Sequence, residues 1–216
     1  MSVATKNPTA AKVFNVPNQL TAARLIIAVV MFFFIAYEWY GTSLMLFVVA
    51  ASTDWLDGYW ARKYGQVTTL GRILDPFVDK IVICGAFIFL AAVPDATWTA
   101  EPSAKIRAWM AVVVVGRELL VTALRGYLEG EGADFSAGMS GKLKMVLQCF
   151  AAGLSLWTLT PEAARPEWFV DLLAIIHFPE ILVWALPIAV WSAVVLTLYS
   201  GLEYILKAVS LLRRSL

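Results

Sequence analysis

Histidine, cysteine and charge are all scarce in this chain of 216 residues. His177 is the only histidine, which excludes a metal site built on several imidazoles and argues against a catalytic histidine. The two cysteines, Cys84 and Cys149, lie in separate apolar stretches, so the sequence predicts neither a disulfide framework nor a cysteine metal site. Only 15% of the residues are charged and the net charge is +1, so no broad basic surface points to nucleic acid.

The sequence is rich in apolar residues. Hydrophobic residues make up 60% of the chain and the mean hydropathy is +0.74, well above the usual balance of a soluble domain. Because a helix needs about 20 mostly apolar residues to cross a bilayer, the sequence predicts an all-α polytopic membrane protein with six transmembrane helices. Residues 1–19 form a short N-terminal cytoplasmic arm or juxtamembrane helix, and residues 20–216 form one membrane domain. The six expected spans are 20–38, 43–61, 73–93, 107–128, 142–160 and 180–206, and the short segment 168–178 is expected at the interface.

The basic residues indicate how these spans are oriented. Six spans alternate the ends of the chain, and all but three of the 17 Lys and Arg residues then fall on one side. Basic residues collect on the cytoplasmic side of membrane proteins. We therefore expect both termini at the cytoplasmic side of the cell (inner) membrane. The three basic residues of the other side are Lys105, Arg107 and Arg165.

Four aspartates stand close together on this cytoplasmic side, at the end of the second span and the start of the third. Residues three or four apart share one face of a helix, and small residues continue both faces. A short loop between antiparallel helices would bring the two faces together. The aspartates are Asp54, Asp57, Asp75 and Asp79, and the small residues are Gly58, Ala61 and Gly71.

Clustered carboxylates near a membrane are costly unless a counter-charge is present. A divalent cation meets this need, and ligation by oxygen alone suits Mg²⁺, Mn²⁺ or Ca²⁺ rather than Zn²⁺. The simpler alternative is a set of ion pairs at the helix ends with Arg62, Arg72 and Lys80. Four carboxylates at this spacing, with small residues on the same faces, favour the metal site.

The whole pattern, Asp-x2-Asp-Gly-x2-Ala-Arg-x8-Gly-x3-Asp-x3-Asp, runs from Asp54 to Asp79. It resembles the signature of the CDP-alcohol phosphotransferases at every fixed position. Three further stretches resemble the bacterial phosphatidylglycerophosphate synthases of that family: Asn15–Arg24 (NVPNQLTAAR), Gly116–Gly126 (GRELLVTALRG) and Ser140–Met145 (SGKLKM). The resemblance implies transfer of a phosphatidyl group from CDP-diacylglycerol to sn-glycerol 3-phosphate, with Mg²⁺ or Mn²⁺ as cofactor and a homodimer as the assembly. It also implies that the active site lies at the cytoplasmic side of the membrane.

The resemblance also implies roles for the signature residues. All four aspartates would hold metal, and Asp79 would additionally be the general base that takes the proton of the acceptor hydroxyl. The expected pocket for the CDP donor has Asp57, Gly58, Ala61, Arg62 and Gly71. Asn18 and Thr21 are further candidates for this pocket, but helix capping at the start of the first span explains them equally well.

A phosphorylated acceptor requires cations. Arg117 and Arg125 lie eight residues apart, about 12 Å along one helix, and about 80° apart around its axis. Lys142 and Arg24 are further candidates for binding the acceptor phosphate. Each of these side chains could instead reach lipid phosphates at the membrane surface, and Lys144 is interpreted as a surface charge. Glu118 is expected to orient a neighbouring arginine.

Three alternatives stay open. The first is the same family with another acceptor, such as inositol phosphate or serine. The second is an intramembrane prenyltransferase, although such enzymes usually carry two aspartate clusters on distant helices. The third is a divalent-cation transporter or a structural membrane protein without enzymatic activity. Acidic residues near the cytoplasmic ends of the spans argue against a path through the bilayer.

Overall fold

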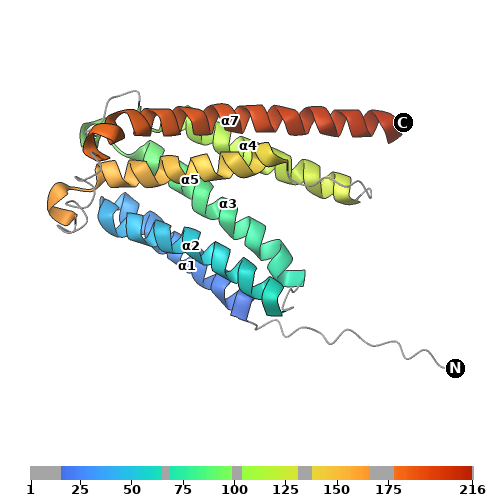
Figure 1. Cartoon of the computed structure of the whole chain (residues 1–216), viewed down its shortest axis with the longest axis horizontal. Coiled ribbons are helices and arrows are strands. Elements are labelled where there is room, and N and C mark those ends of the chain that lie inside the picture. The colour runs from blue at the N-terminus through green and yellow to red at the C-terminus, as the bar shows by residue number, and fades with distance from the viewer. Residues whose placement is uncertain (1–15, 65–68, 99–103, 131–137, 166–177, 216) are drawn as a thin grey trace.

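The protein is a bundle of long α-helices (Figure 1). A computed structural model describes residues 16–64, 69–98, 104–130, 138–165 and 178–215, and these ranges contain no β-strand. The predicted all-α fold is confirmed, and each expected span corresponds to one long helix. These helices are α1 (Val16–Ala36), α2 (Tyr40–Tyr64), α3 (Thr69–Ala92), α4 (Ala108–Gly130), α5 (Met139–Leu159) and α7 (Phe178–Ser215).

The helix boundaries differ from the expected ones in several places. Helix α1 already begins at Val16, so Asn18 lies in its first turn and not at an N-cap. Helix α7 passes through Pro187 without interruption and extends well beyond the expected end at residue 206. The greater part of the expected arm and nearly all of the expected interfacial segment 168–178 lie outside the described residues.

The helices alternate in direction along the bundle. The start of α1, the end of α2, the start of α3, the end of α4, the start of α5 and the end of α7 all lie toward the right in Figure 1. We call this side of the bundle the site end. Helix α1 packs against α2 and α3, and α5 packs along α7. Contacts of α2 and α3 with α5, and of α4 with both α3 and α7, connect the two groups.

Side chains from all six helices form one apolar core. A second, smaller apolar cluster lies at the site end between α4 and α7, where Val121 and Leu128 pack with Tyr204 and Ala208. It gives the end of α4 a separate anchor on α7. The position of the arginines of α4 therefore depends on the C-terminal helix.

The outer surface of the bundle is strongly apolar. Large side chains such as Trp184, Val112 and Met45 are about two-thirds or more exposed. Two helical stretches among the described residues are long and apolar enough to cross a bilayer, Asn18–Ala36 and Ile181–Leu211. Only 28% and 33% of these stretches are buried inside the bundle, whereas a core helix of a soluble protein is mostly buried. Such a surface suits lipid as the solvent.

Several polar contacts lie at the end of the bundle opposite the site end. Lys105 donates a hydrogen bond to the carbonyl of Val93 over 2.9 Å and pairs with Asp95. This ammonium lowers the pKa of the exposed Asp95 carboxyl below its usual value, chiefly through their hydrogen bond. Arg165 donates to the carbonyl of Thr160 over 2.9 Å, just after α5 ends. Cations thus satisfy carbonyl groups beyond the ends of α3 and α5.

Candidate active site

Helix α1 binds the two aspartates of α3. Asp75 and Asp79 lie one turn apart on α3. The Thr21 hydroxyl donates to Oδ1 of Asp75 over 2.6 Å, and Nη1 of Arg24 donates to Oδ1 of Asp79 over 2.7 Å. The two donors are three residues apart on α1 and therefore share one face of that helix. Two parallel contacts thus fix the register between α1 and α3 at the site end.

Among the described cations at this end, Arg24 is the most deeply buried. Only 1% of its side chain is exposed, against 25% of that of Asp79. A buried guanidinium requires an anion, and Asp79 supplies one. Lys80, the next residue, instead donates to the carbonyl of Pro76 on its own helix over 3.0 Å. An ion-pair partner of Asp79 therefore comes from α1, whereas the pairs considered from the sequence involved Arg62, Arg72 and Lys80.

The first half of the aspartate motif lies in the last turns of α2. Asp54, Asp57, Gly58, Ala61 and Arg62 are all helical there, but their side chains are outside the described part of the structure. The side chain of Arg72 is outside it as well.

Gly71, by contrast, is described and is buried near the start of α3. Asn18 is buried near the start of α1, the helix that contacts Asp75. The described side chains contain no group of three potential metal ligands, and they include only two of the four aspartates.

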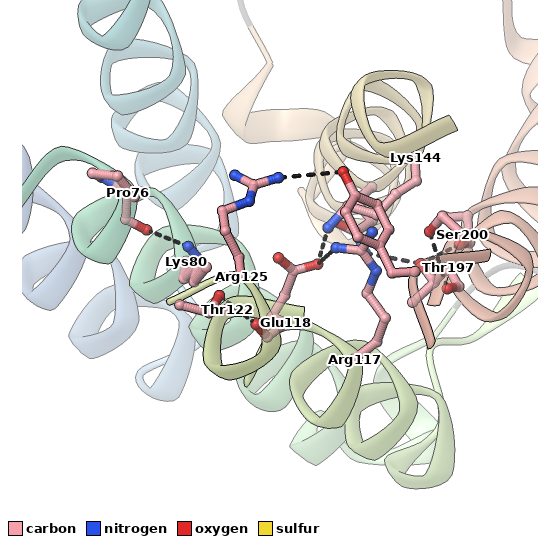
Figure 2. Close-up of polar contacts among 12 residues, drawn as sticks. Pro76, Lys80, Arg117, Glu118, Thr122, Arg125, Lys144, Thr197 and Ser200 are labelled. Atoms are coloured by element: carbon pink, nitrogen blue, oxygen red, sulfur yellow. Dashed lines mark hydrogen bonds and ion pairs between the residues drawn. The ribbon is translucent and has the colours of Figure 1, made fainter. Parts of the chain in front are cut away.

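A second group of charged side chains gathers at the site end between α3, α4 and α5 (Figure 2). Lys80 lies close enough to Arg117 and Arg125 for their charges to act on it. The charges of Arg117 and Lys80 act in the same way on Lys144. We call these four residues the cation cluster. Its members are Lys80 from α3, Arg117 and Arg125 from α4, and Lys144 from α5.

Glu118 is the carboxylate that contacts this cluster. It forms an ion pair with Lys144, and Nη1 of Arg117 lies 3.3 Å from its Oε1 atom. The expectation that Glu118 contacts a neighbouring arginine is thus met at Arg117. The Nε atoms of Arg117 and Arg125 are buried without a hydrogen-bond partner among the described residues. Among the described side chains, these four cations lie beside Glu118, and Asp79, which bonds Arg24, also acts on Lys80. The positive charges still outnumber these two carboxylates, which favours binding of an anion.

The two lysines of α5 lie on different faces of the helix. Lys142 is exposed, whereas only 4% of Lys144 is exposed. The interpretation of Lys144 as a surface charge is therefore wrong. Lys144 shares the buried face of α5 with Gln148 and Ser155, at helical spacing, and this periodicity is a signal that could have identified it. Residues two apart point in nearly opposite directions on a helix, so Lys142 faces outward.

Tyr204 on α7 is a further residue that the sequence did not single out. Its hydroxyl accepts hydrogen bonds from Nη2 of Arg125 over 3.2 Å and from the backbone N–H of Gly138 over 3.1 Å. Gly138 is the N-cap residue of α5. One hydroxyl group therefore connects α4, the start of α5, and α7.

Comparison with known proteins indicates the family to which the chain belongs. A sequence model described as CDP-alcohol phosphatidyltransferase matches residues 14–199. A protein of Bacillus subtilis with the name CDP-diacylglycerol–glycerol-3-phosphate 3-phosphatidyltransferase is 34% identical, over 90% of this chain and 95% of its own length. Proteins with the same name from Salmonella choleraesuis and Shigella flexneri are each 31% identical, over 89% of this chain and 93% of their own lengths.

The family match includes both halves of the aspartate motif, the two arginines of α4 and the buried lysine of α5. The relatives are matched over nearly their full lengths, so the similarity is not confined to one motif. On these grounds the chain belongs to the CDP-alcohol phosphatidyltransferase family.

Proposed function

We propose that this protein transfers a phosphatidyl group from CDP-diacylglycerol to sn-glycerol 3-phosphate, giving phosphatidylglycerophosphate and CMP in phospholipid biosynthesis. The names of the relatives support this substrate pair. The observation that carries the proposal is that two sites of opposite charge lie at the same end of the bundle. The aspartates of α3 suit a metal-bound diphosphate, and the cation cluster beside them suits a second phosphate.

On the donor side, the four aspartates of the motif would hold Mg²⁺ or Mn²⁺. A ligand set of carboxylate oxygens suits these hard cations. A bound divalent ion would offset the charge of the diphosphate and of the departing CMP. The proposed nucleotide pocket consists of Asn18, Thr21, Asp57, Gly58, Ala61, Arg62 and Gly71.

On the acceptor side, Arg117 and Arg125 would bind the phosphate of glycerol 3-phosphate. Guanidinium groups bind phosphate through paired hydrogen bonds, and each of these arginines has a buried Nε atom without a described partner. Lys144 adds a charge beside them. Lys142 and Arg24 remain proposed contacts of the same phosphate, although Arg24 bonds Asp79 in the structure.

The proposed chemical step is a displacement at the phosphorus atom that carries diacylglycerol. The hydroxyl oxygen of the acceptor forms a bond to this phosphorus, and the bond from phosphorus to the CMP oxygen breaks. Asp79 takes the proton of the hydroxyl group, and CMP leaves with the electron pair. Positioning of the two substrates and neutralisation of charge supply most of the acceleration in such reactions.

The proposed setting is the cell membrane, with six spans, both termini in the cytoplasm, and a homodimer as the assembly. The basic residues support the orientation, because Arg125 lies in the second half of α4 and both lysines of α5 lie in its first turns, and these two helix ends lie at the site end. A cytoplasmic site end would meet soluble glycerol 3-phosphate and the headgroup of a lipid donor together.

The test is an acceptor comparison with purified protein in liposomes that contain CDP-diacylglycerol and Mg²⁺. We expect CMP release with glycerol 3-phosphate and much less with myo-inositol phosphate. Release with inositol phosphate alone would assign a different acceptor within the family. Release with neither acceptor would contradict phosphatidyl transfer to a phosphorylated alcohol and favour a transporter or a structural role.

A further inference from the structure

Tyr204 lies between the two arginines of α4. The Cζ atoms of Arg117 and Arg125 are 5.4 and 5.9 Å from the centre of its ring, within the range of cation–π interaction. Its hydroxyl accepts from Nη2 of Arg125 and from the N–H of Gly138. Only 4% of the tyrosine is exposed. Contacts with Arg117, Arg125 and Gly138 therefore hold the side chain of Tyr204 in place.

The two arginines need such a support if they are to act on one ligand. Their Cα atoms are about 12 Å apart along α4, so their long side chains must converge. Both carry a positive charge and repel each other, and Glu118 contacts Arg117. An aromatic face attracts both guanidinium groups, and a hydrogen bond to the hydroxyl restricts the rotamers of Arg125.

Gly201 provides room for this arrangement one turn earlier on α7. A Cβ atom at this position would lie 3.0 Å from Cγ of Arg117 and 4.0 Å from its Cβ. The contact is to the stem of the side chain and not to its flexible end, so a methyl group would require the stem of Arg117 to shift by a few tenths of an ångström. Gly201 and Tyr204 together determine where Arg117 can lie.

We infer that Tyr204 is a positioning residue that holds Arg117 and Arg125 at a fixed separation for the acceptor phosphate, with Gly201 as the space that admits Arg117. The inference rests on the proposed function, because it assigns the acceptor phosphate to these two arginines. Tyr204 acts through the arginines in this account. Its loss should therefore affect acceptor binding much more than donor binding.

The first experiment compares Tyr204→Phe with wild type. The variant keeps the ring and removes the hydroxyl, and a hydrogen bond to a charged group corresponds to about a tenfold change in binding. We expect KM for glycerol 3-phosphate to rise about tenfold, while KM for CDP-diacylglycerol and the melting temperature change little. The matched control is Tyr199→Phe on the exposed face of α7, which should leave both KM values unchanged. An equal rise in both KM values, or none, would overturn the inference.

A double-variant cycle separates positioning from general structural support. If Tyr204 acts through Arg125, then Tyr204→Phe should have no further effect on the acceptor KM in an Arg125→Gln background. If the two substitutions raise the acceptor KM by factors that multiply in the double variant, this role of Tyr204 is contradicted. Gly201→Ala should also raise the acceptor KM, because it displaces Arg117, and Gly126→Ala on α4 is its control, since no described atom lies near a Cβ built there.

A binding measurement keeps this inference separate from the proposed function. Wild type that releases no CMP with glycerol 3-phosphate would refute the proposed function alone. The positioning role is then decided by calorimetric titration of the full-length protein in detergent with inorganic phosphate. We expect wild type to bind phosphate and Tyr204→Phe to bind it about tenfold more weakly. Equal binding by the two proteins, or no binding by wild type, would overturn the role of Tyr204.

Discussion

Asp79 is the residue on which the proposed chemistry depends, and a cation from another helix contacts it. Arg24 donates to its Oδ1 atom over 2.7 Å and is almost fully buried. A guanidinium at this distance fixes the direction of the carboxylate. The contact thus orients the group that would accept the proton.

Replacement of this carboxylate by its amide tests the role of general base. Asp79→Asn keeps the shape and an oxygen that Arg24 can contact, but an amide cannot accept the proton. We expect kcat to fall by about 10² to 10⁴, while a CDP-diacylglycerol analogue still binds. Single-turnover CMP release and equilibrium binding of the analogue measure the two effects. Full activity of the variant would remove Asp79 from this role.

The hydroxyl of Thr21 has a comparable task at Asp75. Its hydrogen bond of 2.6 Å holds one oxygen of a proposed metal ligand, and outer partners of this kind change metal affinity by about 10- to 100-fold. Thr21→Val should therefore raise the Mg²⁺ concentration needed for half-maximal activity by about tenfold. Thr158→Val is the control, because that hydroxyl donates to a carbonyl of its own helix. An unchanged Mg²⁺ requirement would show that Thr21 does not support the ligand.

For single residues, the sequence predicted which side chains share a helix face but not which side chains of different helices contact each other. The spacing of Asp75 and Asp79 was enough to place both on one face of a helix. The pairing of Arg24 with Asp79 was not predictable, because the register between α1 and α3 depends on packing across more than 50 residues of chain. Tyr204 was missed for the same reason, since its partners lie on two other helices.

The helices α4, α5 and α7 meet at the start of α5. Gly138 caps α5 with an extended backbone and donates its N–H to Tyr204. Three residues on, a Cβ atom at Gly141 would lie 3.5 Å from the Tyr204 hydroxyl and 3.9 Å from Nη2 of Arg117. These are ordinary contact distances, so a methyl group fits there. It would occupy space beside a guanidinium of the cation cluster.

Gly141→Ala therefore tests whether this space admits the acceptor. The fold should persist, because no neighbouring atom must move and alanine favours a helix over glycine by about 1 kcal/mol. We expect a higher KM for glycerol 3-phosphate with an unchanged or higher melting temperature. Gly116→Ala, where no described atom lies near the added methyl group, is the control. An unchanged acceptor KM would place the acceptor elsewhere.

The segments that form helices were predictable from the length of the apolar stretches alone, and the all-α class followed from them. Helix ends were less predictable, because α1 and α7 continue through polar residues that carry little hydropathy signal. The face of each helix was predictable only where periodicity was used. Lys144 follows the buried stripe of α5, but a count of charge near the membrane surface treats it like Lys142.

The whole molecule is polarised along the bundle. The cation cluster and the aspartates of α3 lie toward one end, whereas Lys105 and Arg165 satisfy carbonyl groups at the other end. An apolar belt of exposed side chains separates the two ends. This arrangement suits a protein that crosses the membrane and receives its soluble substrate on one side.

Labelling of single cysteines tests this orientation. In a background with Cys84→Ser and Cys149→Ser, Ala163→Cys lies at the end opposite the site and Ser210→Cys near the end of α7, and both positions are exposed. We expect a membrane-impermeant maleimide to label Ala163→Cys on intact spheroplasts and Ser210→Cys only after permeabilisation. The reverse pattern would place the site end outside the cell.

The most direct test of the central claim is the stoichiometry of the reaction. Purified protein in liposomes would receive CDP-diacylglycerol, glycerol 3-phosphate and Mg²⁺, and CMP and lipid products would be measured together. We expect one phosphatidylglycerophosphate for each CMP released, and we expect both products to be lost when Mg²⁺ is chelated. CMP release without this lipid, or no CMP at all, would contradict it.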